Sequence, residues 1–201
     1  MKYVFFVIGR LLFFFCHLLV EVASKCLRAM NTGYYSYKLK KAGKGISLYY
    51  PTGRIIGAEY ITIGDYSSLG KRAVVTAWDN SNSPQIVIGS RVAIGDDCHI
   101  TAANSIVIGD GTLLGKKVTI TDNSHGVLSK SDLLLPPLHR SVYSKGPVLI
   151  GERVWIADKV TICANVTIGD GAVIGANSVV THDIPAYCLA AGVPAVVIKQ
   201  I

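Results

Sequence analysis

The feature that most constrains this chain is a six-residue period between residues 150 and 185. An aliphatic residue returns at the first place of every hexad, often followed by a small residue, and a small or β-branched residue returns at the fifth place. The first places are held by Ile150, Ile156, Ile162, Ile168, Ile174 and Val180. A period of six fits neither an amphipathic helix nor an ordinary strand. It is typical of a solenoid with short straight sides.

The period predicts a triangular coil. If each hexad forms one side and one corner, three hexads form a coil of about 18 residues. The first-place side chains then point inward and stack on those of the next coil, about 4.8 Å away. The residue that follows, at the corner, must be small or must accept an unusual φ, which suits glycine. One coil cannot bury its own apolar side chains, so several coils are needed.

The same hexads occur earlier in the chain, with interruptions. They begin at Ile63, stop at a polar loop over residues 78–85, and resume at Ile88. Two extra residues near Asn104 and Ser105 shift the phase before the hexads continue to residue 120.

A long insertion then separates Ile120 from Ile150, over residues 122–147. The stretch between these two first places is much longer than the single hexad that would suffice. One long loop in a regular scaffold usually carries function. His125 lies at the mouth of this loop, where a neutral imidazole can take a proton from a hydroxyl. A surface histidine without function is the alternative.

Composition narrows the class of protein. The chain has 201 residues, half of them hydrophobic, which argues against disorder. The net charge of +7 suits nucleic acid, a membrane surface or a phosphorylated cofactor. No nucleic-acid-binding motif is present, so we expect no nucleic-acid partner. The five cysteines show no CxxC spacing, which favours free thiols in a reducing compartment over disulfides or a zinc knuckle.

The N-terminal stretch, residues 1–30, differs from the rest. Residues 3–20 form an apolar run that Arg10 interrupts near its centre, which disfavours a transmembrane helix and a secretory signal. Two interpretations stay open for residues 1–28. They form a helix lying on a membrane, with the following lysines against anionic lipid, or a helix that packs on the solenoid or on a partner subunit.

Three stretches carry a resemblance to a known family. Residues 108–125, 150–156 and 191–195 resemble the hexapeptide-repeat acyltransferases, and within them the galactoside, maltose and polysaccharide O-acetyltransferases. Residues 122–126 are most similar to the O-antigen and capsule acetyltransferases. The resemblance covers residues 60–201 and leaves out residues 1–45.

The resemblance implies an all-β fold, a left-handed parallel β-helix, with an apolar helical segment before it and the long loop inserted in it. Parallel crossovers are usually right-handed, so the hand follows from the resemblance alone. The expected divisions are a helical segment and linker over 1–45, the β-helix over 46–186 and a tail over 187–201.

The resemblance also implies an activity. We expect a homotrimer that moves an acetyl group from acetyl-CoA to a hydroxyl of a sugar or glycan, in the cytoplasm or at the inner face of the membrane. His125 matches the catalytic histidine and would act as general base. His99 matches an acceptor-binding position, and Asp122 and Asn123 are further candidate acceptor contacts. Asp122 has two other possible roles, orienting His125 or capping the loop.

A set of positions matches the family's acetyl-CoA site. Trp155 would lie near the thioester arm of acetyl-CoA. Four residues at corners would lie along the pantetheine, and three residues of the C-terminal tail would lie beside the nucleotide and its phosphates. No metal is expected. Val196 departs from the family, which usually carries a basic residue there. The expected acetyl-CoA contacts are Trp155, Ala157, Ala176, Asn177, Thr181, Gly192, Pro194 and Lys199.

Three other functions compete. A serine O-acetyltransferase is disfavoured because its helical N-terminal domain is missing. A hydratase of the γ-carbonic anhydrase type needs three histidine ligands for zinc. His99, His125 and His139 are available, but that family's close histidine pair is not. A non-catalytic binding trimer is the third.

Overall fold

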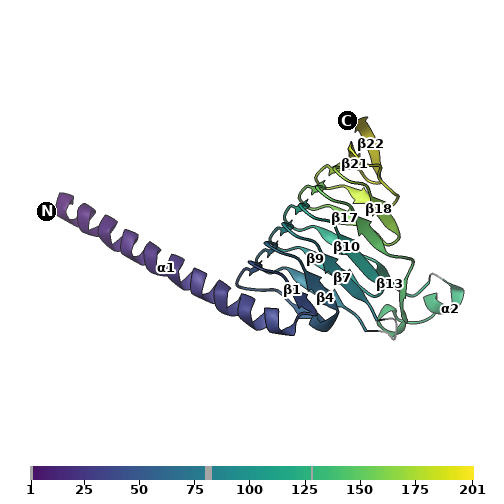
Figure 1. Ribbon diagram of the computed structural model, residues 1–201, viewed down its shortest axis with the longest axis horizontal. Helices are drawn as coiled ribbons and strands as arrows, with labels where there is room; N and C mark the ends of the chain where they lie inside the picture. Colours follow the sequence, from purple (N-terminus) through teal and green to yellow (C-terminus); the bar gives the residue numbers. More distant parts are fainter. Residues whose placement is uncertain (1, 80–82, 128) are drawn as a thin grey trace.

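The computed structural model describes residues 2–79, 83–127 and 129–201. A long helix, α1 (Lys2–Lys38), leads into a stack of triangular coils, and a small excursion with the helix α2 (Lys130–Leu133) projects from the side (Figure 1). Part of the predicted 78–85 loop, residues 80–82, and one residue of the predicted insertion, residue 128, lie outside the described chain.

The three sides of the coils form three sheets whose strands are parallel, except for β22 at the end of sheet B. Sheet A contains β1 (Lys41–Ala42), β4 (Ile61–Ile63), β7 (Gln85–Ile88), β10 (Ser105–Ile108), β15 (Val148–Ile150) and β18 (Val166–Ile168). Sheet B contains β2 (Ser47–Leu48), β5 (Ser68–Leu69), β8 (Ala93–Ile94), β11 (Leu113–Leu114), β16 (Trp155–Ile156), β19 (Val173–Ile174), β21 (Cys188–Gly192) and β22 (Ala195–Gln200). Sheet C contains β3 (Ile55–Ile56), β6 (Val74–Ala77), β9 (His99–Ala102), β12 (Thr119–Thr121), β17 (Thr161–Ile162) and β20 (Val179–Val180).

The inward stacking of the first-place residues is confirmed. Ile108, Ile150 and Ile168 are in register in sheet A, and all three are buried. Ile120, Ile162 and Val180 do the same in sheet C. The fold is the expected left-handed parallel β-helix.

The second-place residue was expected to be small or to accept an unusual φ, and in the structure these two properties belong to different places of the hexad. The glycine at the second place is required by close approach, because a Cβ on Gly109 would lie 2.5 Å from the backbone of Gly151. The left-handed φ falls instead on the fourth place of the hexad, as at Arg153 and Asn177. Left-handed φ is uncommon outside glycine, so each of these corners is held there by its neighbours.

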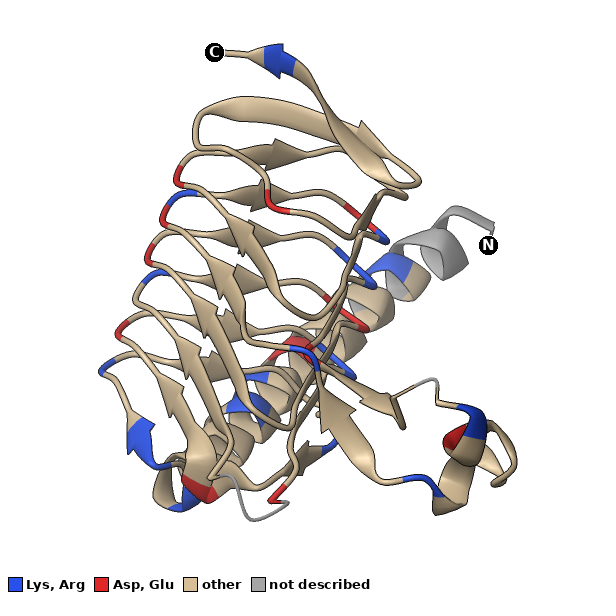
Figure 2. Cartoon of the chain, turned by 90° about the vertical axis from the view of Figure 1, so that its right-hand side faces the viewer, with Lys and Arg blue, Asp and Glu red and all other residues tan. Residues whose placement is uncertain are grey.

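Aspartates at the third place of the hexad join successive coils by hydrogen bonds. The Oδ1 atom of Asp110 accepts a hydrogen bond from the backbone N–H of Ser90 one coil earlier, at 2.8 Å. Asp158 and Asp170 repeat this bond at the same distance. Figure 2 shows acidic and basic residues following one another along the corners, while the strands in the middle of the stack carry few charges.

The stack starts earlier than its repeats. The region before the first hexad contributes β1, from the predicted linker over 1–45, and β2, from the start of the predicted β-helix, to a first coil. Asn31 and Thr32 at the end of α1 bind this coil through the backbone of Leu48, at 3.0 Å each. A short 3-10 helix, η1 (Ala58–Tyr60), completes it.

The two ends of the chain close the stack differently. At the C-terminal end, β21 and β22 form an antiparallel hairpin over the last coil. At the N-terminal end, α1 adjoins the first coil. Within the described residues, no helix has both the length and the apolarity to cross a membrane.

The two extra residues near position 104 are held by one buried carboxylate. Asp122 is fully buried and accepts hydrogen bonds from the backbone N–H groups of Ala103, Asn104 and Ser105, at 2.7, 2.9 and 2.7 Å. Asp122 also starts the long insertion, so the same side chain fixes the widened corner and the departure of the loop.

We expect Ile168→Asp to lower the free energy of unfolding by at least about 4 kcal/mol, since it places an unpaired charge between coils. The neighbouring Thr167 is exposed on the same strand, so Thr167→Asp should cost less than about 1 kcal/mol. Thermal unfolding of both variants measures this. Equal stability of the two would contradict the inward stacking.

Asp122→Asn should lower the free energy of unfolding by about 2–4 kcal/mol, because an amide NH₂ would face backbone N–H groups that now donate to a carboxylate. Asp110→Asn is the control. Its single bond to Ser90 can be kept by the amide oxygen, so a loss below about 1 kcal/mol is expected. Comparable unfolding midpoints for the two variants would exclude the role given to Asp122.

Candidate active site

The insertion begins and ends as a two-stranded ribbon. β13 (Asn123–His125) pairs antiparallel with β14 (Val142–Ser144), and His125 lies opposite Val142. The chain between them carries α2 and a second 3-10 helix, η2 (Pro137–His139). The N-cap Ser129 accepts a hydrogen bond from the N–H of Asp132 at the start of α2.

The ribbon and the outer face of sheet C enclose a pocket of about 350 Å³. Side chains in a strand alternate between faces. His99 is on the outer face of β9, and the ribbon brings His125, from the insertion, to the same pocket. The pocket is lined by Trp78, His99, Thr101, Asn123, His125, Leu138 and Val142.

Both histidines that line this pocket are exposed. The His125 ring makes no hydrogen bond or ion pair with the residues that the structure describes. Trp78, Leu138 and Val142 give the pocket mainly apolar walls. An imidazole in such a site can accept a proton from a bound hydroxyl.

Trp78 is a pocket residue that the sequence did not reveal. Its indole Nε1–H donates to the Thr101 hydroxyl at 2.9 Å, which holds the ring beside the pocket, and 43% of its surface stays exposed. The available sequence signal is a tryptophan at the corner where the hexads first break. An indole whose N–H is satisfied leaves a flat apolar face for contact.

Of the other two predicted acceptor contacts, Asn123 lines the pocket and Asp122 does not. Asn123 lines the pocket while its amide donates to the backbone oxygen of Thr101 at 3.0 Å and to Asp122 at 3.1 Å. Asp122 itself is behind the pocket, with its oxygens directed to the corner at 103–105. Its carboxylate makes no described bond to His125.

A second pocket, of about 380 Å³, lies on the opposite side of the ribbon. Ser124 faces this side, as alternation along β13 requires. The predicted cofactor residue Thr181 is here, beside Lys145 and Cys163. This pocket and the histidine pocket share Asn123, so the ribbon separates two adjoining hollows.

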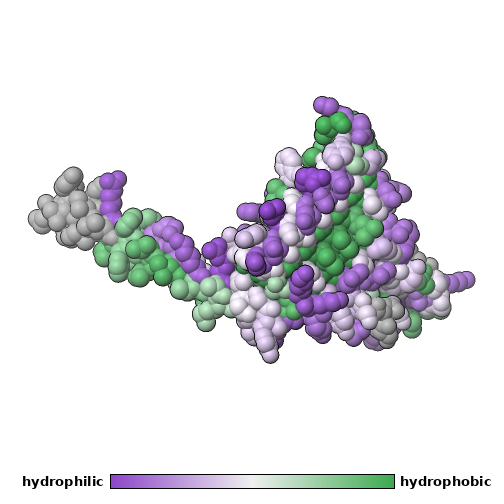
Figure 3. Space-filling model, in the orientation of Figure 1, coloured by the Kyte–Doolittle hydropathy of each residue, from purple (hydrophilic) through white to green (hydrophobic). Residues whose placement is uncertain are grey.

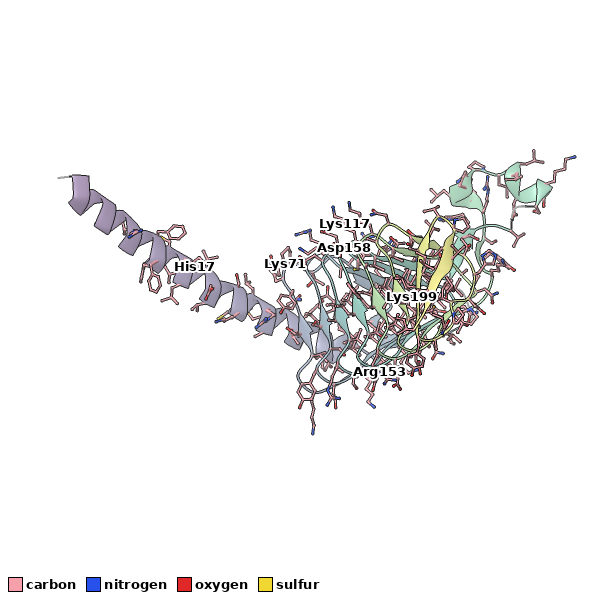
Figure 4. The ribbon with its side chains drawn as sticks, turned by 90° about the horizontal axis from the view of Figure 1, so that it is seen from above. His17, Lys71, Lys117, Arg153, Asp158 and Lys199 are labelled. Carbon is pink, nitrogen blue, oxygen red and sulfur yellow. The ribbon has the colours of Figure 1, made fainter. Side chains whose placement is uncertain are left out.

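The remaining predicted cofactor residues are elsewhere on the prism. Trp155 is 52% exposed on the outer face of sheet B. Ala157, Ala176 and Asn177 occupy the corner between sheets B and C, where the N–H of Asn177 donates to the Asp158 carbonyl at 3.0 Å. In Figure 4 Asp158 and Lys117 mark this corner and Arg153 marks another. Gly192, Pro194 and Lys199 are in the C-terminal hairpin. A single chain does not bring these residues to His125.

Cys98, the buried thiol next to His99 in sequence, is not an available nucleophile. Burial raises its pKa to about 11, and its Sγ lies 3.1 Å from the carbonyl oxygen of Gly115. The thiol therefore stays protonated near neutral pH. Within the described residues, no three histidine, cysteine, aspartate or glutamate side chains are grouped so as to hold a metal ion.

Comparisons with known proteins agree with this architecture. Residues 147–182 match the family model "Bacterial transferase hexapeptide (six repeats)". The chain is 42% identical to the putative lipopolysaccharide biosynthesis O-acetyl transferase WbbJ of Escherichia coli, over 57% of this chain and 60% of that protein. It is 31% identical to the putative colanic acid biosynthesis acetyltransferase WcaF of Escherichia coli, over 67% of this chain and 69% of that protein. The chain thus spans less than two thirds of the length of WbbJ.

Among solved structures, a mutant of the N-acyltransferase AntD from Bacillus cereus shares the fold. Its TM-score is 0.68 at 20% identity, over 81% of this chain and 84% of that one. The repeats, the coil geometry and the relationship to WcaF lead to one conclusion: this chain belongs to the hexapeptide-repeat acetyltransferase family.

Proposed function

We propose that this protein transfers an acetyl group from acetyl-CoA to a hydroxyl of a sugar or glycan, with His125 as general base. The observation that carries the proposal is the pocket that joins His125 and His99 between apolar walls. The names of two relatives support the substrate class, since WbbJ is described as acting in lipopolysaccharide biosynthesis and WcaF in colanic acid biosynthesis.

In the proposed acetyl transfer, His125 accepts one proton and later returns it. The imidazole takes the proton of the acceptor hydroxyl while its oxygen attacks the thioester carbon. The tetrahedral oxyanion needs hydrogen-bond donors, for which backbone N–H groups are suited. Collapse of this intermediate breaks the carbon–sulfur bond, and the imidazolium returns its proton to the departing thiolate of CoA. The histidine therefore ends each cycle neutral.

The walls of the pocket suit a sugar ring. The exposed face of Trp78 offers an apolar surface for the C–H face of a sugar. His99 and Asn123 supply polar atoms for acceptor hydroxyls. For Asp122 we propose a supporting role, because its carboxylate already accepts three backbone hydrogen bonds.

The distribution of the predicted site residues over separate faces of the prism supports an assembly of several subunits. We propose a homotrimer in which sheet C of one subunit faces sheet B of the next. Such a groove would bring Trp155 and the corner residues of one subunit to His125 of the other, with CoA between them. The reaction belongs in the cytoplasm, where acetyl-CoA is made, and we propose contact with the inner face of the membrane through residues 1–28.

We expect His125→Ala to lower kcat by about 10²–10⁴-fold while leaving the Kd for acetyl-CoA within a few-fold, since a general base contributes in that range. Thiol release from acetyl-CoA with a sugar acceptor, and calorimetry with CoA, measure the two quantities. His139→Ala is the control, because His139 is exposed and outside the pocket lining. Turnover by His125→Ala close to that of His139→Ala would reject His125 as the base. A trimer that forms normally but shows no turnover even in the unchanged protein would favour a binding scaffold.

Trp78→Leu should raise the KM for the sugar acceptor by about fivefold or more, because loss of an aromatic face removes roughly 1 kcal/mol or more. Trp78→Phe keeps a ring and should recover much of that loss. The KM for acetyl-CoA should change little in both variants. A selective effect on the acetyl-CoA KM would contradict the acceptor role of Trp78.

A further inference from the structure

Helix α1 has an unusual surface for a helix attached to a β-helix. Large apolar side chains on it are exposed, including Phe13 at 73% and Met30 at 72% of their surfaces. The same stretch exposes Leu12, Phe14, Phe15, Leu18, Leu19, Val20 and Val22. The helix leaves the first coil sideways and extends away from the prism (Figure 1). A contiguous apolar surface of this kind marks a site for a partner or a membrane.

Six polar residues of α1 share one face of the helix, the polar stripe. Arg10, His17, Glu21, Ser24, Arg28 and Asn31 follow one another at intervals of seven, four, three, four and three residues. This spacing puts them on one face of a helix. In Figure 3 hydrophilic residues follow the upper edge of α1 while apolar residues cover the side below.

The polar stripe is also the face that meets the protein. Asn31 donates to the first coil, and the Arg28 guanidinium stacks over the Tyr49 ring at 5.0 Å. Ser24, Lys25 and Arg28 line a hollow with Tyr49 and Tyr50. The C-terminal part of the stripe, residues 24–31, thus faces the β-helix, and His17 and Glu21 continue the same face into solvent.

Charge identifies what the apolar side meets. Residues 1–45 contain eight lysines and arginines and one acidic residue, Glu21. A basic segment of this composition is attracted to anionic lipid. The apolar side covers most of the helix circumference, whereas a coiled-coil seam needs only a narrow stripe. Arg10, His17 and Glu21 share one edge, so all three can reach headgroups if the helix lies flat.

We propose that α1 is an in-plane anchor: it lies parallel to an anionic membrane surface, with its apolar side in the lipid and its polar stripe toward the β-helix. This goes beyond the acetyl transfer proposed above, and it deepens the proposed membrane contact by fixing the orientation of the helix. It sets the first coil next to the lipid headgroups. A glycan acceptor carried by a lipid in that membrane would then be held near the enzyme.

The test is cosedimentation of the full chain with vesicles of phosphatidylcholine, alone or mixed with phosphatidylglycerol. We expect binding to the mixed vesicles and clearly weaker binding to phosphatidylcholine alone. The variant Phe15→Gln/Leu19→Gln/Val22→Gln changes the centre of the apolar side. It should bind roughly 1000-fold more weakly, since each such side chain contributes about a factor of ten or more.

The matched control places three glutamines on the polar stripe, as His17→Gln/Glu21→Gln/Ser24→Gln, and should bind within a few-fold of the unchanged protein. Equal losses in the two triple variants would overturn the proposal. The proposal would also be overturned if the protein did not bind vesicles but formed soluble assemblies that the apolar-side variant abolishes. A second copy of the chain, and not lipid, would then cover the apolar side of α1.

Orientation is read by oriented circular dichroism of the full chain in stacked bilayers. The α1 signal should be that of a helix parallel to the bilayer, and a perpendicular helix would overturn the in-plane anchor. Acetylation of a soluble sugar by both triple variants is measured in parallel. Because α1 is outside the pocket, retained activity with lost vesicle binding separates the anchor from the proposed chemistry.

Discussion

The stacking of one aliphatic side chain per side on its counterpart in the next coil is the interaction on which the rest of this structure depends. The interior is almost wholly apolar, so each coil gains stability only from its neighbours. The corner aspartates add hydrogen bonds between the same coils, and the second-place glycines allow the backbones to approach closely enough for both. Such a scaffold is regular and has few places for chemistry except where it is interrupted.

The interruptions are what make a site. Asp122 widens one corner and starts the insertion, and the β13–β14 ribbon then turns back over sheet C. The ribbon separates two hollows, with His125 facing one and Ser124 facing the other. Position in the stack gives His99 its orientation, while the ribbon gives His125 its orientation. The two histidines line one pocket because the inserted ribbon folds back over the rigid sheet that carries His99.

The sequence predicted the periodic part of this arrangement well, because the first-place residues face a single environment and the period reports it directly. It also predicted the inserted loop, since the spacing between Ile120 and Ile150 departs from one hexad. It did not predict β1, the first strand of the stack, because the hexads begin only at Ile63, and it did not assign the left-handed φ to the fourth place. Trp78 was missed because its role depends on the ribbon folding back, and no local pattern encodes that.

If the acetyl group meets its acceptor in the pocket shared by Trp78, His99 and His125, the thioester of the donor must reach that pocket. A crystal structure with CoA bound tests this most directly. We predict the CoA sulfur at the opening of the pocket, within hydrogen-bonding reach of the His125 ring or one water molecule from it, in a groove completed by a neighbouring subunit. A CoA bound with its sulfur on another face of the prism, remote from His125, would contradict this placement of the reaction.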